Sequence, residues 1–179
     1  MSQLLKNKMK IALAQLNPKV GDVKGNISKL ISIRNDLSKD VDIMVVPELY
    51  VTGYPIDDLV LRNDFLELVE NEISDLAKLT NDGKAAIILG SPRKDEDKIR
   101  NSVFVLDQGK ILSFRDKHNL PNTGVFDEQR IFTPGSLSGP VKIRETLVGL
   151  PICEDIWNEM VIDCLSETGA EIIISINAS

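Results

Sequence analysis

The sequence predicts an α/β fold in which helices cover a layered, mixed sheet, and three patterns lead to this class. Short β-branched runs alternate along the 179 residues with amphipathic stretches of helical periodicity, as in proteins built from strand and helix layers. A hairpin interrupts that alternation, because apolar runs at 100–106 and 110–114 flank the turn 107–109. The hydrophobic content of 42% is that of a globular domain large enough to bury a core.

The first third of the chain predicts a strand, a helix and a strand. Residues 10–15 indicate a short buried strand, which is followed by a loop with Pro and Gly. Asn26 is expected to cap the first helix, whose apolar face comprises Ile27, Leu30, Ile31 and Leu37. The β-branched run 42–46 indicates a second strand, which would deliver Glu48 at its carboxyl end.

The middle of the chain predicts a loop, a helix and a strand before the hairpin. The loop spans residues 49–58 and is rich in Gly, Pro and Asp. Asn63 and Asp64 are candidate caps of the second helix, whose apolar face comprises Leu66, Val69, Ile73, Leu76 and Ala77. Residues 85–90 are expected to form the next strand.

The last third predicts a long loop followed by shorter elements. The loop covers residues 116–139, and one or two strands are expected within 141–152. A short helix would carry Val161, Ile162 and Leu165, and a final strand is expected at 171–176. A terminal strand needs a covering layer, so a chain that stops at Ser179 is expected to be a truncated domain.

Composition excludes several classes of function. The formal net charge is −6, which argues against a surface for nucleic acid or anionic membranes. No run approaches the ~20 apolar residues of a membrane-spanning helix, and the first ten residues lack the apolar core of a signal peptide. The two cysteines do not suggest a disulfide framework, so a reducing cytoplasmic setting is expected.

Cys153 is the most informative single residue. It follows an apolar, strand-like run and precedes two carboxylates, a good place for a nucleophile on a rigid scaffold. Taken alone, it is better explained as a small buried hydrophobe. Glu48 and Lys117 also follow strand-like runs, although each alone could be a solvated surface charge. Together they make chemical sense: the thiol attacks a carbonyl, the carboxylate transfers protons and the ammonium stabilises the oxyanion.

Three sequence motifs around these residues resemble those of the carbon–nitrogen hydrolase, or nitrilase, superfamily, whose hallmark is a Glu-Lys-Cys triad. They are residues 47–59 (PELYVTGYPIDDL), 117–122 with 126–132 (KHNLPN and FDEQRIF), and 152–157 (ICEDIW). Their details are similar to the glutaminase domain of the glutamine-dependent NAD synthetase branch. The resemblance implies an α-β-β-α sandwich, incomplete at the carboxyl end, that dimerises through a helical face.

The same resemblance implies a division of labour. The domain in residues 1–179 would hydrolyse L-glutamine through a cysteine acyl-enzyme and pass ammonia to a synthetase domain in cis. That second domain would use ATP and Mg to amidate deamido-NAD, and nothing in this chain resembles its nucleotide loop. The glutaminase domain itself would need no cofactor or metal, and the protein is expected to be a homo-oligomer.

The resemblance also assigns roles to five residues. Glu48 would be the general base, Lys117 the cation beside the oxyanion and Cys153 the nucleophile. The backbone N–H of Glu154 would be a second oxyanion donor. Glu128 resembles the additional glutamate of the family that orients the lysine.

Substrate contacts are expected from three further residues. Tyr54 would line the pocket, and Ser179 matches a substrate-contacting serine of the family. Thr123 stands where the NAD synthetase branch usually has a glutamine-binding tyrosine, so this contact departs from the pattern. His118 is the only histidine, so neither a Cys-His-Asn site nor a histidine zinc site is supported. Cys164 is expected to lie in the core.

One physical tension follows from this set. Glu48, Glu154 and Asp155 would all oppose formation of a thiolate at Cys153 by like-charge repulsion. Lys117 must therefore offset them, and Lys117→Ala is expected to lose glutaminase activity with the fold intact. Two alternatives stay open: another carbon–nitrogen hydrolase, such as an ω-amidase or carbamoylase, or a catalytically inert structural fragment.

Overall fold

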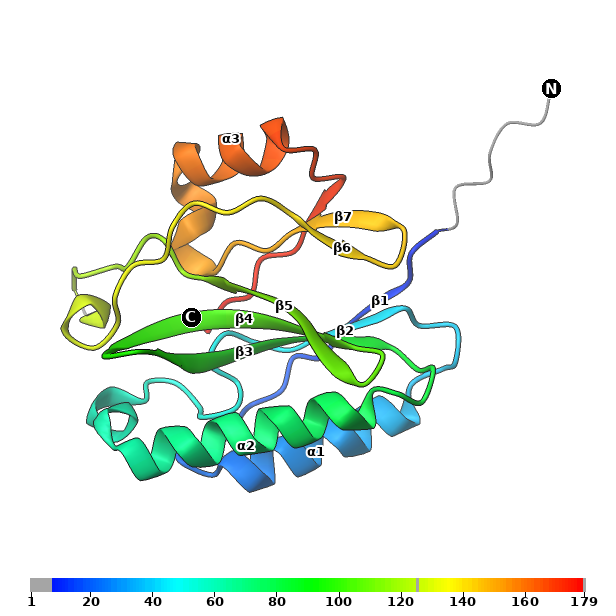
Figure 1. Ribbon diagram of the computed structural model, residues 1–179, viewed down its shortest axis with the longest axis horizontal. Coiled ribbons are helices and arrows are strands. Elements are labelled where there is room, and N and C mark those ends of the chain that lie inside the picture. The colour runs from blue at the N-terminus through cyan, green and yellow to red at the C-terminus, as the bar shows by residue number, and fades with distance from the viewer. Residues whose placement is uncertain (1–7, 125, 179) are drawn as a thin grey trace.

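The computed structural model describes residues 8–124 and 126–178 and has four layers (Figure 1). A five-stranded sheet has the order β1-β2-β3-β4-β5, and a three-stranded sheet has the order β6-β7-β8. The first sheet comprises β1 (Ile11–Leu13), β2 (Ile43–Val45), β3 (Ala86–Asp95), β4 (Lys98–Asp107) and β5 (Lys110–Asp116). The second sheet comprises β6 (Val141–Ile143), β7 (Thr146–Gly149) and β8 (Ile172–Ile173).

Helices form the two outer layers. Figure 1 shows α1 and α2 side by side on one face of the five-stranded sheet, while α3 lies beyond β6 and β7 on the opposite side. The α-helices are α1 (Val23–Asp36), α2 (Asn63–Leu79) and α3 (Glu159–Glu167), and the 3-10 helices are η1 (Asp57–Leu61), η2 (Glu128–Arg130) and η3 (Cys153–Trp157). The predicted α-β-β-α sandwich is confirmed.

Two apolar cores hold the layers together, and β3 contributes to both. Ile87 and Leu89 pack toward α1 and α2, whereas Ala86 and Ile88 pack toward the three-stranded sheet. Successive side chains of a strand point to opposite faces, so a strand between two layers must be apolar on both. This explains why the run is continuously hydrophobic rather than alternating.

The sheet is mixed, as the sequence predicts. β1, β2 and β3 are parallel, while β4 and β5 continue antiparallel from β3. The predicted hairpin turn lies between β4 and β5, with Gln108 and Gly109 at positive φ. A second hairpin between β3 and β4, which the sequence did not predict, turns at Glu96 (φ 55°) and extends β3 beyond the expected residues 85–90.

The predicted helix caps were wrong. Asp22 caps α1, because its side chain accepts a hydrogen bond from the N–H of Gly25. Asn26 is instead buried inside the helix, where its side-chain amide donates to Lys19 O and Val51 O. Its side chain ties the helix to a distant loop, a role that local sequence patterns do not reveal.

The second helix and the first strand also differ from expectation. α2 is preceded by Arg62, which makes no side-chain cap, so neither Asn63 nor Asp64 caps the helix. β1 was expected to be buried, but Leu13 is 70% exposed because this strand forms the edge of the sheet. The last strand is shorter than predicted, and an isolated bridge at Ile176 follows it. Within the described residues, no helix combines the length and apolar character needed to cross a membrane.

Candidate active site

Glu48 lies just beyond the carboxyl end of β2 and is almost completely buried. The segment that carries it passes very close to β3 at Gly90. A Cβ added at Gly90 would lie 2.7 Å from Glu48 Cα and 2.4 Å from Pro47 O, so only glycine permits this approach. The strand end and the glycine together place the carboxylate inside the molecule rather than on its surface.

Lys117 directly follows β5, and its side chain is buried beside two carboxylates. Its Nζ lies 2.7 Å from Glu48 Oε1 and 2.9 Å from Glu128 Oε1. The backbone of Lys117 is held as well, since its N–H donates to Asn101 O and its carbonyl accepts from the N–H of Gly135. Both the position of the chain and the direction of the ammonium are therefore constrained.

Asn101 is part of this cluster, although the sequence analysis did not identify it. Its Nδ2 donates to Glu48 Oε1 at 2.8 Å, and the N–H of Ala178 donates to Glu48 Oε2 at 3.1 Å. Glu48 thus accepts three hydrogen bonds, counting that of Lys117. Asn101 stands between Arg100 and Ser102 in the polar first half of β4, so the sequence carried no local signal for its role.

The electrostatics of the cluster favour a charged lysine. Burial lowers the pKa of Lys117, but attraction to Glu48 and Glu128 and the hydrogen bonds with both outweigh burial and raise it. Burial raises the pKa of Glu128 despite its contact with Lys117. Within the described residues, Glu128 Oε2 and Asn101 Oδ1 are the buried side-chain atoms without a hydrogen-bond partner.

Cys153 begins η3, immediately after the segment that leaves β7. Its φ is 47°, in the left-handed region that non-glycine residues seldom adopt. Its N–H donates to Ile176 O at 2.9 Å, two residues before the Ala178 N–H that binds Glu48. The segment 176–178 therefore links the turn at Cys153 to the carboxylate of Glu48.

An open groove adjoins this cluster. It has a volume of about 480 Å³ and is lined by Gln15, Leu16, Asn17, Pro18, Pro47, Glu48, Tyr54, Asn177 and Ala178. Tyr54 also lines a smaller cavity of about 70 Å³ that Glu128 borders. Burial, with contributions from Glu128 and Glu48, raises the pKa of Tyr54 to about 12, so its phenol is neutral at pH 7.

The remaining predicted contacts are less central. Thr123 is exposed and lines neither the groove nor the smaller cavity. Glu154 is half-buried beside Cys153. Ser179 lies outside the described residues. Asp155, which is expected to oppose a thiolate at Cys153, is buried, and its carboxylate accepts hydrogen bonds from the backbone N–H groups of Asn119 and Ile152. No group of three or more His, Cys, Asp or Glu among residues 8–124 and 126–178 is arranged to hold a metal ion.

Comparison with known proteins places these features in context. The family model for carbon-nitrogen hydrolase matches residues 10–179. The glutamine-dependent NAD(+) synthetase of Rhodobacter capsulatus is 36% identical over 97% of this chain and 31% of its own length. The enzyme of the same name from Thermotoga maritima is 41% identical over 84% of this chain and 26% of its own.

Solved structures agree with this result. A glutamine-dependent NAD+ synthetase from Acinetobacter baumannii, in complex with ADP, has a TM-score of 0.88 and 35% identity, covering 96% of this chain and 32% of that chain. A carbon-nitrogen hydrolase from Helicobacter pylori shares the fold, with a TM-score of 0.79 and 22% identity, over 94% of this chain and 59% of that one. The chain thus spans about a third of the length of the curated relatives it matches.

Proposed function

This chain belongs to the carbon-nitrogen hydrolase family, and on that premise we propose that it hydrolyses the side-chain amide of L-glutamine to glutamate and ammonia. The observation that carries the proposal is the buried Lys117, which bridges Glu128 and Glu48, and Glu48 lines an open groove. A buried ion cluster costs free energy to desolvate, so it is weak evidence for stability alone. Perturbed ionisable groups beside a groove are typical of catalytic sites.

In the first half of the reaction, Glu48 accepts the proton of the Cys153 thiol, and Sγ attacks the carboxamide carbon of glutamine. The oxyanion that forms is stabilised by Lys117 Nζ and the backbone N–H of Glu154. Glu48 then gives its proton to the amide nitrogen, the C–N bond breaks and ammonia departs. A thioester between Cys153 and the glutamyl group remains.

In the second half, Glu48 removes a proton from water, which attacks the thioester carbonyl. Collapse of the second tetrahedral intermediate breaks the C–S bond, returns the proton to Sγ and releases glutamate. Lys117 suits both steps, because an ammonium has three N–H donors and two are directed at Glu48 and Glu128. The third can be directed at the oxyanion.

The destination of the ammonia is a further part of this proposal. The relatives are named as glutamine-dependent NAD synthetases and are about three times as long as this chain. We therefore propose a synthetase domain in cis that takes ATP, Mg and deamido-NAD, in a cytoplasmic homo-oligomer. Exposed apolar side chains at Trp157 and Met160 support contact with another copy.

The proposal is tested by incubating the protein with glutamine and measuring glutamate and ammonia. Equal amounts of both products are expected, and Cys153→Ala should yield neither. A parallel panel of ω-amides and carbamoyl amines separates the alternatives. Faster hydrolysis of either class would favour the ω-amidase or carbamoylase alternative. Absence of turnover on every substrate by a folded protein would favour the inert fragment.

A further inference from the structure

Asp155 lies two residues after Cys153 in η3, and the residue is 3% exposed. Three backbone N–H groups donate hydrogen bonds to its carboxylate. Oδ1 accepts from the N–H of Asn119 at 2.6 Å and of His118 at 3.0 Å. Oδ2 accepts from the N–H of Ile152 at 3.1 Å and, more weakly, of His118 at 3.3 Å.

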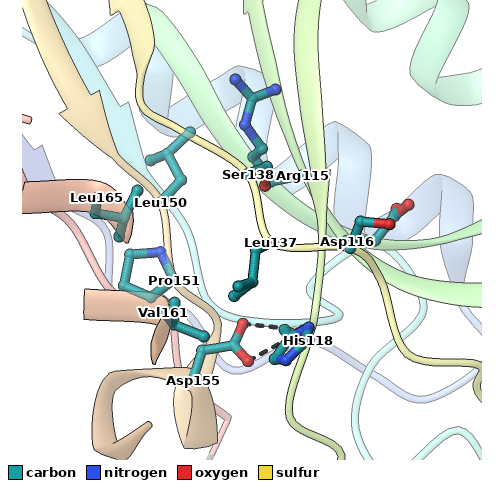
Figure 2. Close-up of a pocket in the computed structure, with 11 residues that line it drawn as sticks. Arg115, Asp116, His118, Leu137, Ser138, Leu150, Pro151, Asp155, Val161 and Leu165 are labelled. Atoms are coloured by element: carbon teal, nitrogen blue, oxygen red, sulfur yellow. Dashed lines mark hydrogen bonds between the residues drawn. The ribbon is translucent and has the colours of Figure 1, made fainter. Parts of the chain in front are cut away.

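These donors belong to two different segments of the site. His118 and Asn119 directly follow Lys117 at the end of β5, whereas Ile152 directly precedes Cys153 after β7. Figure 2 shows the carboxylate of Asp155 facing His118, with the hydrogen bonds between them drawn across the space separating the two segments. One side chain therefore joins the loop that carries the lysine to the turn that carries the cysteine.

A second and longer connection runs through the segment 176–178, which bonds to Cys153 and to Glu48. The ion pairs of Lys117 and its backbone bond to Asn101 tie it to the five-stranded sheet. Cys153 is bonded to Ile176, a neighbour of the three-stranded sheet. The carboxylate of Asp155 joins the segment of Lys117 to the segment of Cys153 through a single rigid group.

We propose that Asp155 is a positioning residue that fixes the position of the Lys117 ammonium relative to the thiol of Cys153. The inference rests on the proposed glutamine hydrolysis and adds to it a residue that touches neither substrate nor reacting atoms. Small displacements of catalytic groups reduce rates strongly, by about 100-fold for 1 Å. A bridge between the two segments is therefore a direct means of controlling the rate.

A carboxylate is the side chain this bridge requires. Its two oxygens can accept from both segments at once, whereas an asparagine has one acceptor oxygen of the same reach. Asp155→Asn must therefore release either the segment after Lys117 or the residue before Cys153, with little change in side-chain volume. Asp163→Asn is the matched control, because Asp163 is an exposed acid on α3.

Two measurements on the purified protein test the proposal. In Asp155→Asn, kcat for glutamine should fall about 10- to 100-fold while KM changes less than about threefold. The second measurement is the rate of alkylation of Cys153 by iodoacetamide as a function of pH. Its midpoint should move to higher pH in Asp155→Glu, which keeps the negative charge near Cys153 while its added methylene group displaces one of the bonded segments and, with it, the ammonium. Asp163→Asn should match the wild type in both.

The alkylation of each cysteine can be followed separately. Cleavage after glutamate separates the peptides of Cys153 and Cys164, because Glu154 and Glu159 lie between them. Cys164 then serves as an internal reference that should alkylate alike in all variants. The alkylation measurement needs no substrate. It therefore tests whether Asp155 positions Lys117 relative to Cys153 even if the wild type fails to hydrolyse glutamine. Such a failure would overturn only the proposed function.

An unchanged kcat in a folded Asp155→Asn variant would overturn the proposal, whatever the change in melting temperature. If that variant does not fold, Asp155→Glu also provides the test of kcat, since its added methylene group must move one of the bonded segments. A shifted profile with reduced kcat in Asp155→Glu supports the bridge. A wild-type profile and kcat in a folded Asp155→Glu variant contradicts it.

Discussion

The two sides of the candidate site differ sharply in their burial. On the side of the five-stranded sheet, Glu48, Lys117 and Glu128 form a charged cluster that is at most 6% exposed. On the side of the three-stranded sheet, Cys153 is half-buried at the start of η3, and Trp157 at the end of the same turn is 80% exposed. The charges are enclosed, whereas the proposed nucleophile is accessible.

This difference in burial matches the different roles proposed for the charged cluster and the nucleophile. Enclosed charges act in a medium of low dielectric constant, where an oriented ammonium stabilises an oxyanion more than it would in water. A nucleophile must instead be reachable by substrate and free of crowding. We therefore expect variants on the charged side to affect both stability and turnover, and variants at the nucleophile to affect turnover alone.

The largest combined effect is expected for Lys117→Met. Removing the ammonium leaves two buried carboxylates without their cation, which should lower the free energy of unfolding by about 3–5 kcal/mol and abolish turnover. The enclosure of the cluster thus changes the expectation that the fold stays intact without this lysine. Urea denaturation measures the loss, and adding Glu128→Gln to the variant should restore part of it. A loss below about 1 kcal/mol would contradict this account.

At the nucleophile the effect should be confined to chemistry. Cys153→Ala is expected to reduce ammonia release at least about 1,000-fold, because no acyl-enzyme can form. The free energy of unfolding should change by less than about 1 kcal/mol, since the thiol is only half-buried. Cys164→Ala is the control and should retain turnover. Turnover by Cys153→Ala within about tenfold of the wild type would rule out the assignment.

Asn101→Ala should moderately reduce both the stability of the fold and the rate of turnover. The variant deprives Glu48 of a buried hydrogen-bond donor, which should lower the free energy of unfolding by about 1–3 kcal/mol and turnover about tenfold. Asn63→Ala removes an exposed asparagine that binds Lys94 and should change stability by less than about 0.5 kcal/mol. Equal effects of the two variants would remove Asn101 from the site.

Among the variants of the charged cluster, Glu128→Gln is expected to have the smallest effect on stability, and this effect should depend on pH. Burial raises the pKa of Glu128 in the folded protein, so stability is lost as pH rises from the ordinary glutamate pKa of the unfolded chain to this higher pKa, and the loss is complete above it. The penalty is absent well below the ordinary pKa of a glutamate, about 4.3. The variant should therefore gain stability relative to the wild type as pH rises from about 4. Stability curves of the variant and the wild type that stay parallel over this pH range would contradict this sign.

The sequence was sufficient to predict the layers of the fold because they follow from periodicity. Continuous apolar runs became β2 and β3, and the Gln108-Gly109 turn formed the expected hairpin. The exposure of Leu13 was not predictable in the same way. It depends on which strand lies at the edge of the sheet, and that is a property of the topology rather than of the run itself.

Sequence alone predicted the residues of the site that belong to recognisable motifs. It did not predict the residues whose roles depend on contacts formed in the fold. Glu48, Lys117 and Glu128 were singled out by resemblance, and the structure brings these three together. Asn101 was missed because a lone asparagine in a strand carries no motif. The hydrogen bonds of Asp155 were not predicted, because they depend on backbone N–H groups from a segment 36 residues away.

The central claim is that Cys153 attacks the side chain of glutamine, and covalent labelling tests it most directly. The protein would be treated with a diazoketone analogue of glutamine, cleaved after glutamate and examined by mass spectrometry. We predict a single adduct on Cys153 that excess glutamine prevents, with Cys164 unlabelled. Labelling of Cys164 instead, or no adduct on a protein shown to be folded by circular dichroism, would contradict the account.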